Sequence, residues 1–75
     1  MSSDLDIFTT IELEQQSDLY YRGGIRLYHI ADGIDPKHDG ARWKVLAAAA
    51  REQFELMRAV HLELARRTAE DHAHA

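Results

Sequence analysis

Apolar and small residues recur along this chain at alternating spacings of four and three, in two separate stretches. The first stretch contains Leu13, Ser17, Tyr20, Gly24, Leu27, Ala31 and Ile34. The second contains Trp43, Ala47, Ala50, Phe54, Met57, His61 and Leu64. In an α-helix this spacing places all members of a series on one face. The pattern therefore predicts two amphipathic helices that pack together through these faces.

The two series fit each other when one of them is read backwards. Gly24 then lies opposite Phe54, and Ser17 lies opposite His61. The same register pairs Leu13 with Leu64, Tyr20 with Met57, Leu27 with Ala50, Ala31 with Ala47 and Ile34 with Trp43. Large side chains facing small ones are what interdigitated packing requires. We therefore expect an all-α fold, an antiparallel two-helix hairpin.

Local signals mark both ends of the first helix. Thr9 and Glu12 have the spacing of a capping box, in which each side chain accepts a hydrogen bond from the other residue's backbone N–H. Gly33 suits a left-handed residue that ends a helix, and Pro36 follows shortly after it. The first helix should therefore span about residues 10–32.

The adjacent glycines Gly23 and Gly24 allow an alternative, in which the first helix breaks into two shorter ones. Each internal glycine costs a helix about 1 kcal/mol relative to alanine. The heptad phase nevertheless passes through both glycines without interruption, and Gly24 is the position that faces the bulky Phe54. We therefore favour one continuous helix.

The second helix has two candidate starts. Asp35 followed by Pro36 is a good cap with proline in the first turn, and Asp39 followed by Gly40 is the other possibility. We favour Asp39, so that the helix spans about residues 40–68. The chain is then a single domain, residues 1–75, with short flexible ends at residues 1–8 and 69–75.

Composition and charge narrow the function classes. The chain of 75 residues has no cysteine, a formal net charge of −4 and no apolar run approaching the ~20 residues of a membrane span. We expect a cytoplasmic protein that binds neither membranes nor nucleic acid, because a phosphate backbone repels net negative charge. The high alanine and arginine content is typical of bacterial sequences. Charge is uneven: net −5 over residues 1–21, +3 over 22–51 and −2 over 52–75.

Each predicted helix carries a second apolar stripe outside the heptad series. A lone hairpin would expose these stripes, whereas two hairpins packed as a dimeric four-helix bundle would bury them. The expected interface residues are Tyr21, Ile25, Tyr28, Leu46, Leu56 and Val60, supported by Ala49. The sequence thus favours a small oligomerisation and protein–protein interaction module, an accessory or regulatory subunit that binds itself or a larger protein.

His61 carries the alternative hypothesis, an enzyme or metal-binding bundle with its site at a subunit interface. Glu12, Glu14 or Asp18 would have to supply the carboxylates. Metal ligation within one helix needs a second ligand three or four residues away. Those positions around His61 are occupied by Met57, Arg58, Leu64 and Ala65. We therefore predict no metal, no cofactor and no catalytic residue, and expect His61 to be a hydrogen-bonded contact residue.

Overall fold

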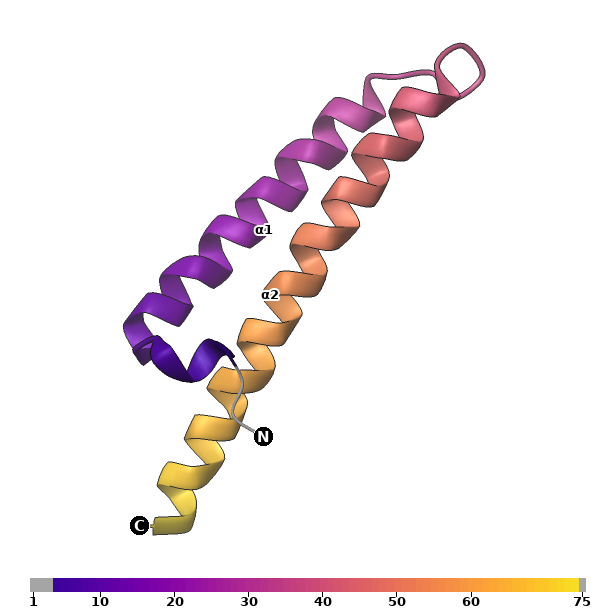
Figure 1. Ribbon diagram of the computed structural model, residues 1–75. Coiled ribbons are helices and arrows are strands. Elements are labelled where there is room, and N and C mark those ends of the chain that lie inside the picture. The colour runs from indigo at the N-terminus through magenta and orange to yellow at the C-terminus, as the bar shows by residue number, and fades with distance from the viewer. Residues whose placement is uncertain (1–3, 75) are drawn as a thin grey trace.

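Two long α-helices lie side by side in the computed structural model, which describes residues 4–74 (Figure 1). A short 3-10 helix, η1 (Asp4–Ile7), precedes α1 (Thr10–Asp32), and α2 (Gly40–His74) runs back along it. The hairpin measures 57 × 22 × 18 Å. The predicted all-helical hairpin is confirmed, and α1 has the bounds expected from the sequence.

The start of α1 is fixed by the expected capping box. The backbone N–H of Glu12 donates to Thr9 Oγ1 at 3.1 Å, and the N–H of Thr9 donates to Glu12 Oε1 at 2.9 Å. The helix then runs without a break through Gly23 and Gly24. The continuous alternative is therefore confirmed, and packing against α2 gives the physical reason.

The end of α1 differs from the expectation. Gly33 has φ −80° and ψ −4°, a right-handed conformation, so the predicted left-handed cap is wrong. The last turn tightens instead: the N–H of Gly33 donates to Ile30 O at 3.2 Å, and the N–H of Ile34 donates to Ala31 O at 2.9 Å. Such bonds from residue i+3 to residue i satisfy the terminal carbonyls without positive φ.

Asp35 and Asp39 have different roles in the connection between the two helices. Asp35 Oδ1 accepts from the N–H of Lys37 at 2.9 Å, which closes a local turn rather than starting a helix. Asp39 caps α2, because its Oδ1 accepts from the N–H of Arg42 at 3.4 Å and its carbonyl accepts from the N–H of Trp43 at 3.1 Å. The favoured start is therefore confirmed.

The ends of the chain are more regular than the sequence indicated. The helix α2 extends six residues beyond the expected end, to His74, and η1 lies inside the stretch 1–8 that was expected to be flexible. Arg66 pairs with Glu70 one turn further on, which supports the extra turns. Residues 1–3 and 75, which belong to the same prediction, lie outside the described part of the chain.

The face of α2 that meets α1 is broader than the predicted one. Five members of the predicted series are buried or half-buried: Ala47, Ala50, Phe54, Met57 and Leu64. A second column beside it is buried or half-buried as well: Leu46, Ala49, Gln53, Val60, Glu63 and Arg67. Trp43 and His61, which belong to the predicted series, are exposed at its edge. The two glycines explain the breadth, because a Cβ on Gly24 would meet Phe54 of the predicted series and a Cβ on Gly23 would meet Gln53 of the second column. The contact thus runs between these two columns.

Candidate functional site

Three aromatic rings gather around Gly24, where α2 packs against α1. Phe54 of α2 lies over Gly24 of α1, at the register pair expected from the sequence. Tyr21 meets the Phe54 ring edge-on, with centroids 6.2 Å apart, and Tyr28 stacks on it at 5.8 Å and an interplanar angle of 23°. The tyrosines flank Gly24 along one side of α1, so they hold the Phe54 ring from both ends.

This cluster faces outward. Tyr21 is 50% exposed, Tyr28 is 40% exposed, and Ile25 between them is 37% exposed. Positions 21, 25 and 28 follow the spacing that shares a helix face. We call these three residues, together with Phe54, the tyrosine face. The tyrosine face is an apolar surface, and the Phe54 ring supports it from behind.

The other predicted interface residues do not join this surface. Leu46 is half-buried between the helices, and Val60 is only 1% exposed. Leu56 is exposed, but it follows Phe54 by two residues, which turns it about 200° around α2. Within one hairpin, Leu46 and Val60 are thus among the buried or half-buried positions and Leu56 lies on another side. An interface formed by all six residues stays a prediction.

A polar network occupies that other side of α2. Glu63 follows Phe54 by nine residues, two and a half helical turns, and so points away from the tyrosine face. Its side chain is buried and accepts from Arg66 Nε at 2.8 Å and from Arg67 Nε at 3.2 Å. The hydrogen bond from Arg66 lowers the pKa of this carboxyl below its usual range; burial opposes that effect and Arg67 adds to it.

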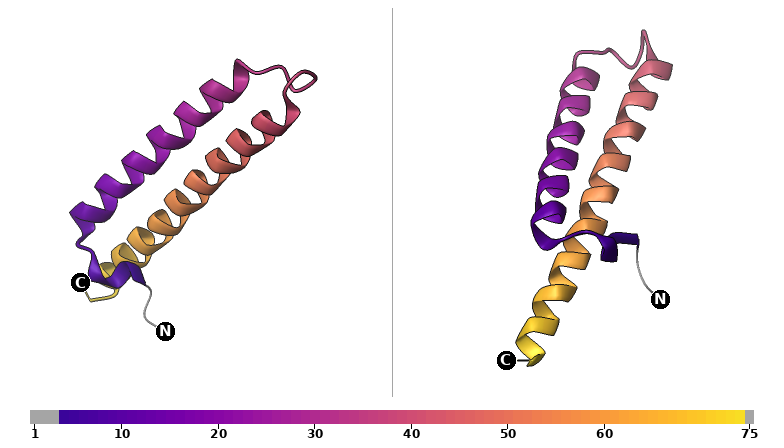
Figure 2. Two further views of the ribbon diagram at one scale, coloured as in Figure 1. Left: turned by 45° about the horizontal axis from the view of Figure 1, so that its top comes forward. Right: turned by 60° about the vertical axis from the view of Figure 1, so that its left-hand side comes forward.

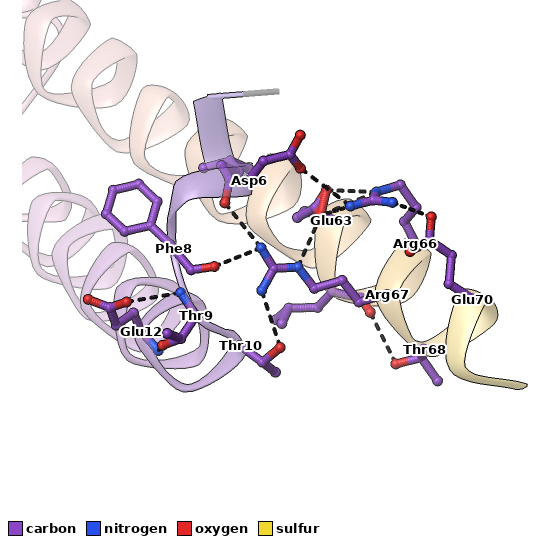
Figure 3. A network of polar contacts seen from close by, with 12 residues as sticks. Asp6, Phe8, Thr9, Thr10, Glu12, Glu63, Arg66, Arg67, Thr68 and Glu70 are labelled. Atoms are coloured by element: carbon purple, nitrogen blue, oxygen red, sulfur yellow. Dashed lines mark hydrogen bonds and ion pairs between the residues drawn. The ribbon is translucent and has the colours of Figure 1, made fainter. Parts of the chain in front are cut away.

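Arg67 connects this network to the beginning of the chain (Figure 3). Its Nη2 donates to the carbonyl oxygens of Leu5 at 3.2 Å and Phe8 at 2.8 Å, and its Nη1 donates to Thr10 Oγ1 at 3.2 Å. The bound segment, residues 5–8, is the N-terminal strap. It crosses α2 near the open end of the hairpin (Figure 2). Val60, three residues before Glu63, is buried on this part of α2.

Arg66 completes the network from the solvent side. It pairs with Glu70 and reaches Asp6 of the strap at 3.3 Å. Beside it lies an apolar hollow of about 300 Å³, lined by Leu5, Ala59, Leu62, Glu63 and Arg66. Sequence reasoning missed this cluster. The available signal was Glu63 followed by arginines at the third and fourth positions, a spacing typical of ion pairs within a helix.

His61 lies at the edge of the contact between the helices. Its Nε2 is 2.5 Å from Ser17 Oγ, the side chain predicted to face it, and the two form a hydrogen bond. Of the carboxylates considered as its partners, Glu12 bonds Thr9 and Asp18 pairs with Arg22 at 3.0 Å, while Glu14 is exposed. Within residues 4–74, no three histidine, aspartate or glutamate side chains are grouped as metal ligands.

Comparison with protein-family models, with curated proteins and with solved structures finds no match to this chain. Among the described residues, neither helix has an apolar stretch that could cross a bilayer. The function is therefore inferred from the surface of the hairpin itself.

Proposed function

We propose that this protein is a small oligomerisation and protein–protein interaction module that completes its core against a partner. Its own core is thin. The fully buried apolar side chains of the described chain are Leu13, Ala31, Ala50 and Val60, two of which are alanines. A two-helix hairpin has no third layer to cover its outer apolar side chains, and small domains of this kind are usually stabilised by association.

The exposed surface is the observation that carries this proposal. A folded monomer of this mass exposes about 4,700 Å². The hairpin exposes 5939 Å², an excess of about 1,200 Å² over that expectation. A specific interface of ordinary size removes about 800 Å² from each partner. Association through one such interface would remove most of this excess, and a dimeric four-helix bundle is the simplest assembly that would do so.

An accessory or regulatory role fits this architecture. The described part of the chain offers helical surface, and the polar network around Glu63 is occupied in holding the strap. The partner is a second copy of the chain, a larger protein, or both in succession. In each case the module works by presenting a fixed apolar surface rather than by chemistry of its own.

Sedimentation equilibrium across the micromolar range tests this function. We expect a reversible oligomer, and a thermal midpoint that rises with protein concentration, because association stabilises the folded state by mass action. A well-folded monomer with no concentration dependence would contradict the proposal for self-association. Metal analysis of the purified protein is the companion measurement: stoichiometric iron, manganese or zinc would favour the alternative site at His61.

A further inference from the structure

We propose that the tyrosine face binds a second copy of this chain end-for-end, with Ile25 beside the two-fold axis. This inference rests on the proposed function and specifies its partner, surface and orientation. Each hairpin would place its α1 against α1 of the other copy, running in the opposite direction. The same patch then serves both copies, as two-fold symmetry requires.

The tyrosine face is the surface of the hairpin best prepared for this contact. Tyr21 and Tyr28 are already held against the Phe54 ring, so burying them costs little side-chain freedom. Tyrosine and phenylalanine are enriched at the centres of interfaces. The opposite side of α2 is less suitable, because the strap crosses it at Glu63 and interrupts a flat approach.

The spacing along α1 matches a two-fold axis near Ile25. In an antiparallel helix pair, a residue before the axis on one helix lies beside the residue equally far beyond the axis on the other. Tyr21 lies four residues before Ile25 and Tyr28 lies three after it. Each Tyr21 therefore packs near the partner's Tyr28, and the two Ile25 side chains meet between them. This order places the bulkiest apolar groups symmetrically around the centre.

Charge favours the reversed orientation. Residues 22–51 form the half of the hairpin that contains the turn and carry net +3, whereas residues 1–21 and 52–75 form the open half and carry −5 and −2. The excess positive charge comes from Arg22, Arg26 and Arg51, because the acidic and basic residues between positions 27 and 50 cancel. Reversal sets the basic half of one copy against the acidic half of the other. One like-charge pair remains level across the axis, Asp18 with the other copy's Asp32, but Asp18 is already paired with Arg22 at 3.0 Å.

Two aspartate substitutions on the same helix test the face. Ile25→Asp places a charge at the centre of the proposed contact, and the dissociation constant should rise by at least about a hundredfold. Ile30→Asp is the matched control: Ile30 is 41% exposed, against 37% for Ile25, and lies about 140° around α1 from it. This control should change the dissociation constant by less than about threefold. Circular dichroism at high protein concentration checks that both variants remain helical.

A single introduced cysteine tests the orientation, because the natural chain contains none. In the end-for-end dimer, Ile25→Cys brings two thiols close enough for a disulfide, which needs Cα atoms within about 7 Å. If both turns lay at the same end, each α1 would pack on the other copy's α2 and the two cysteines would lie on diagonally opposite helices. Ile30→Cys is the control and should not cross-link.

The outcomes separate this inference from the broader function. Dissociation by Ile25→Asp together with rapid cross-linking of Ile25→Cys supports it. A dimer that resists Ile25→Asp, that is dissociated by Ile30→Asp, or that fails to cross-link through Ile25→Cys overturns it while leaving self-association intact. A protein that is monomeric at every concentration overturns both.

Discussion

Phe54 fills the space in which a side chain on Gly24 would stand. A Cβ built on Gly24 would lie 2.7 Å from Phe54 Cζ, 2.8 Å from Cε2 and 3.0 Å from Cε1. These separations are well inside van der Waals contact, and the ring has little room to retreat because Tyr21 and Tyr28 contact it on either side. Glycine at this position is therefore a packing requirement, and it sets how closely α1 and α2 approach.

Substitution of Gly24 should destabilise the hairpin although it improves helix propensity. Gly24→Leu overfills the layer, and we expect a net loss of about 1–3 kcal/mol in the free energy of unfolding. Urea denaturation at a fixed protein concentration measures it. Phe54→Leu in the Gly24→Leu background should recover part of the loss, since the two positions share one space. A Gly24→Leu protein with a higher melting temperature would contradict the observed contact.

The neighbouring glycine provides the control. At Gly23 the added Cβ would meet Gln53 Oε1 at 3.2 Å, the far end of a flexible side chain that can move aside. Gly23→Ala should therefore leave stability unchanged or raise it by up to about 1 kcal/mol, the gain in helix propensity. Opposite signs for Gly23→Ala and Gly24→Leu would show that the cost at Gly24 comes from the Phe54 ring and not from the helix backbone.

Removing Arg67 should release the strap. Arg67→Ala removes the hydrogen bonds to Leu5 O, Phe8 O and Thr10 Oγ1 together with the ion pair to Glu63, and we expect a loss of about 1–3 kcal/mol. Hydrogen exchange and limited proteolysis should increase at residues 5–8, while α1 keeps its protection. Arg22→Ala is the control, because its pair with Asp18 is solvent-exposed and contributes at most about 1 kcal/mol. Equal protection of the strap in both variants would refute the role of Arg67.

Stability should fall in acid because two carboxyls have lowered pKa values. The pKa of Glu63 is lowered by its hydrogen bond from Arg66, and the pKa of Glu12 by the backbone and side chain of Thr9. A carboxyl whose pKa is lower in the folded state stabilises the fold above its unfolded pKa, here 4.5, and loses that contribution as pH falls through the folded value. In Glu63→Gln, stability should be lower at neutral pH and depend less on pH below that point. If the free energy of unfolding depended on pH in the same way in both proteins, the lowered pKa of Glu63 would not be the cause.

The last turns of α2 should contribute little to the hairpin. They extend beyond the start of α1 (Figure 1), and Glu70 contacts Arg66 through an exposed ion pair. A chain ending at Thr68 should therefore lose less than about 1 kcal/mol of stability. Chemical denaturation of the shortened chain checks this, and a larger loss would show that residues 69–74 take part in an assembly rather than only in their own helix.

The sequence predicted much of the hairpin because its signals are local or periodic. The Thr9–Glu12 cap, the Asp39 start and the continuous α1 follow from short-range rules, and two pairs of the long-range register, Gly24 with Phe54 and Ser17 with His61, are present in the structure. These features depend on which residue types fit together at a known spacing.

The second column of contact residues on α2 could not be predicted in the same way. Ala50, Met57 and Leu64 belong equally to two series of alternating spacing, and hydrophobicity favours the one containing Trp43 over the one containing Gln53. The close approach at the two glycines brings both series into the contact, and that is a property of the packed pair of helices. Val60 consequently lies inside the hairpin instead of on an outer stripe.

The strap was missed for a different reason: Arg67 binds residues 5–8 through main-chain carbonyls, those of Leu5 and Phe8. Every residue type has a main-chain carbonyl, so the sequence at positions 5 and 8 does not reveal this contact. Substitutions at these two positions need not disturb it. Homologues of this protein should therefore be sought through its spacing constraints rather than through overall identity. The expected signature has two parts. The first is a glycine on the first helix with an aromatic residue thirty positions later, and the second is a glutamate with arginines three and four positions after that glutamate.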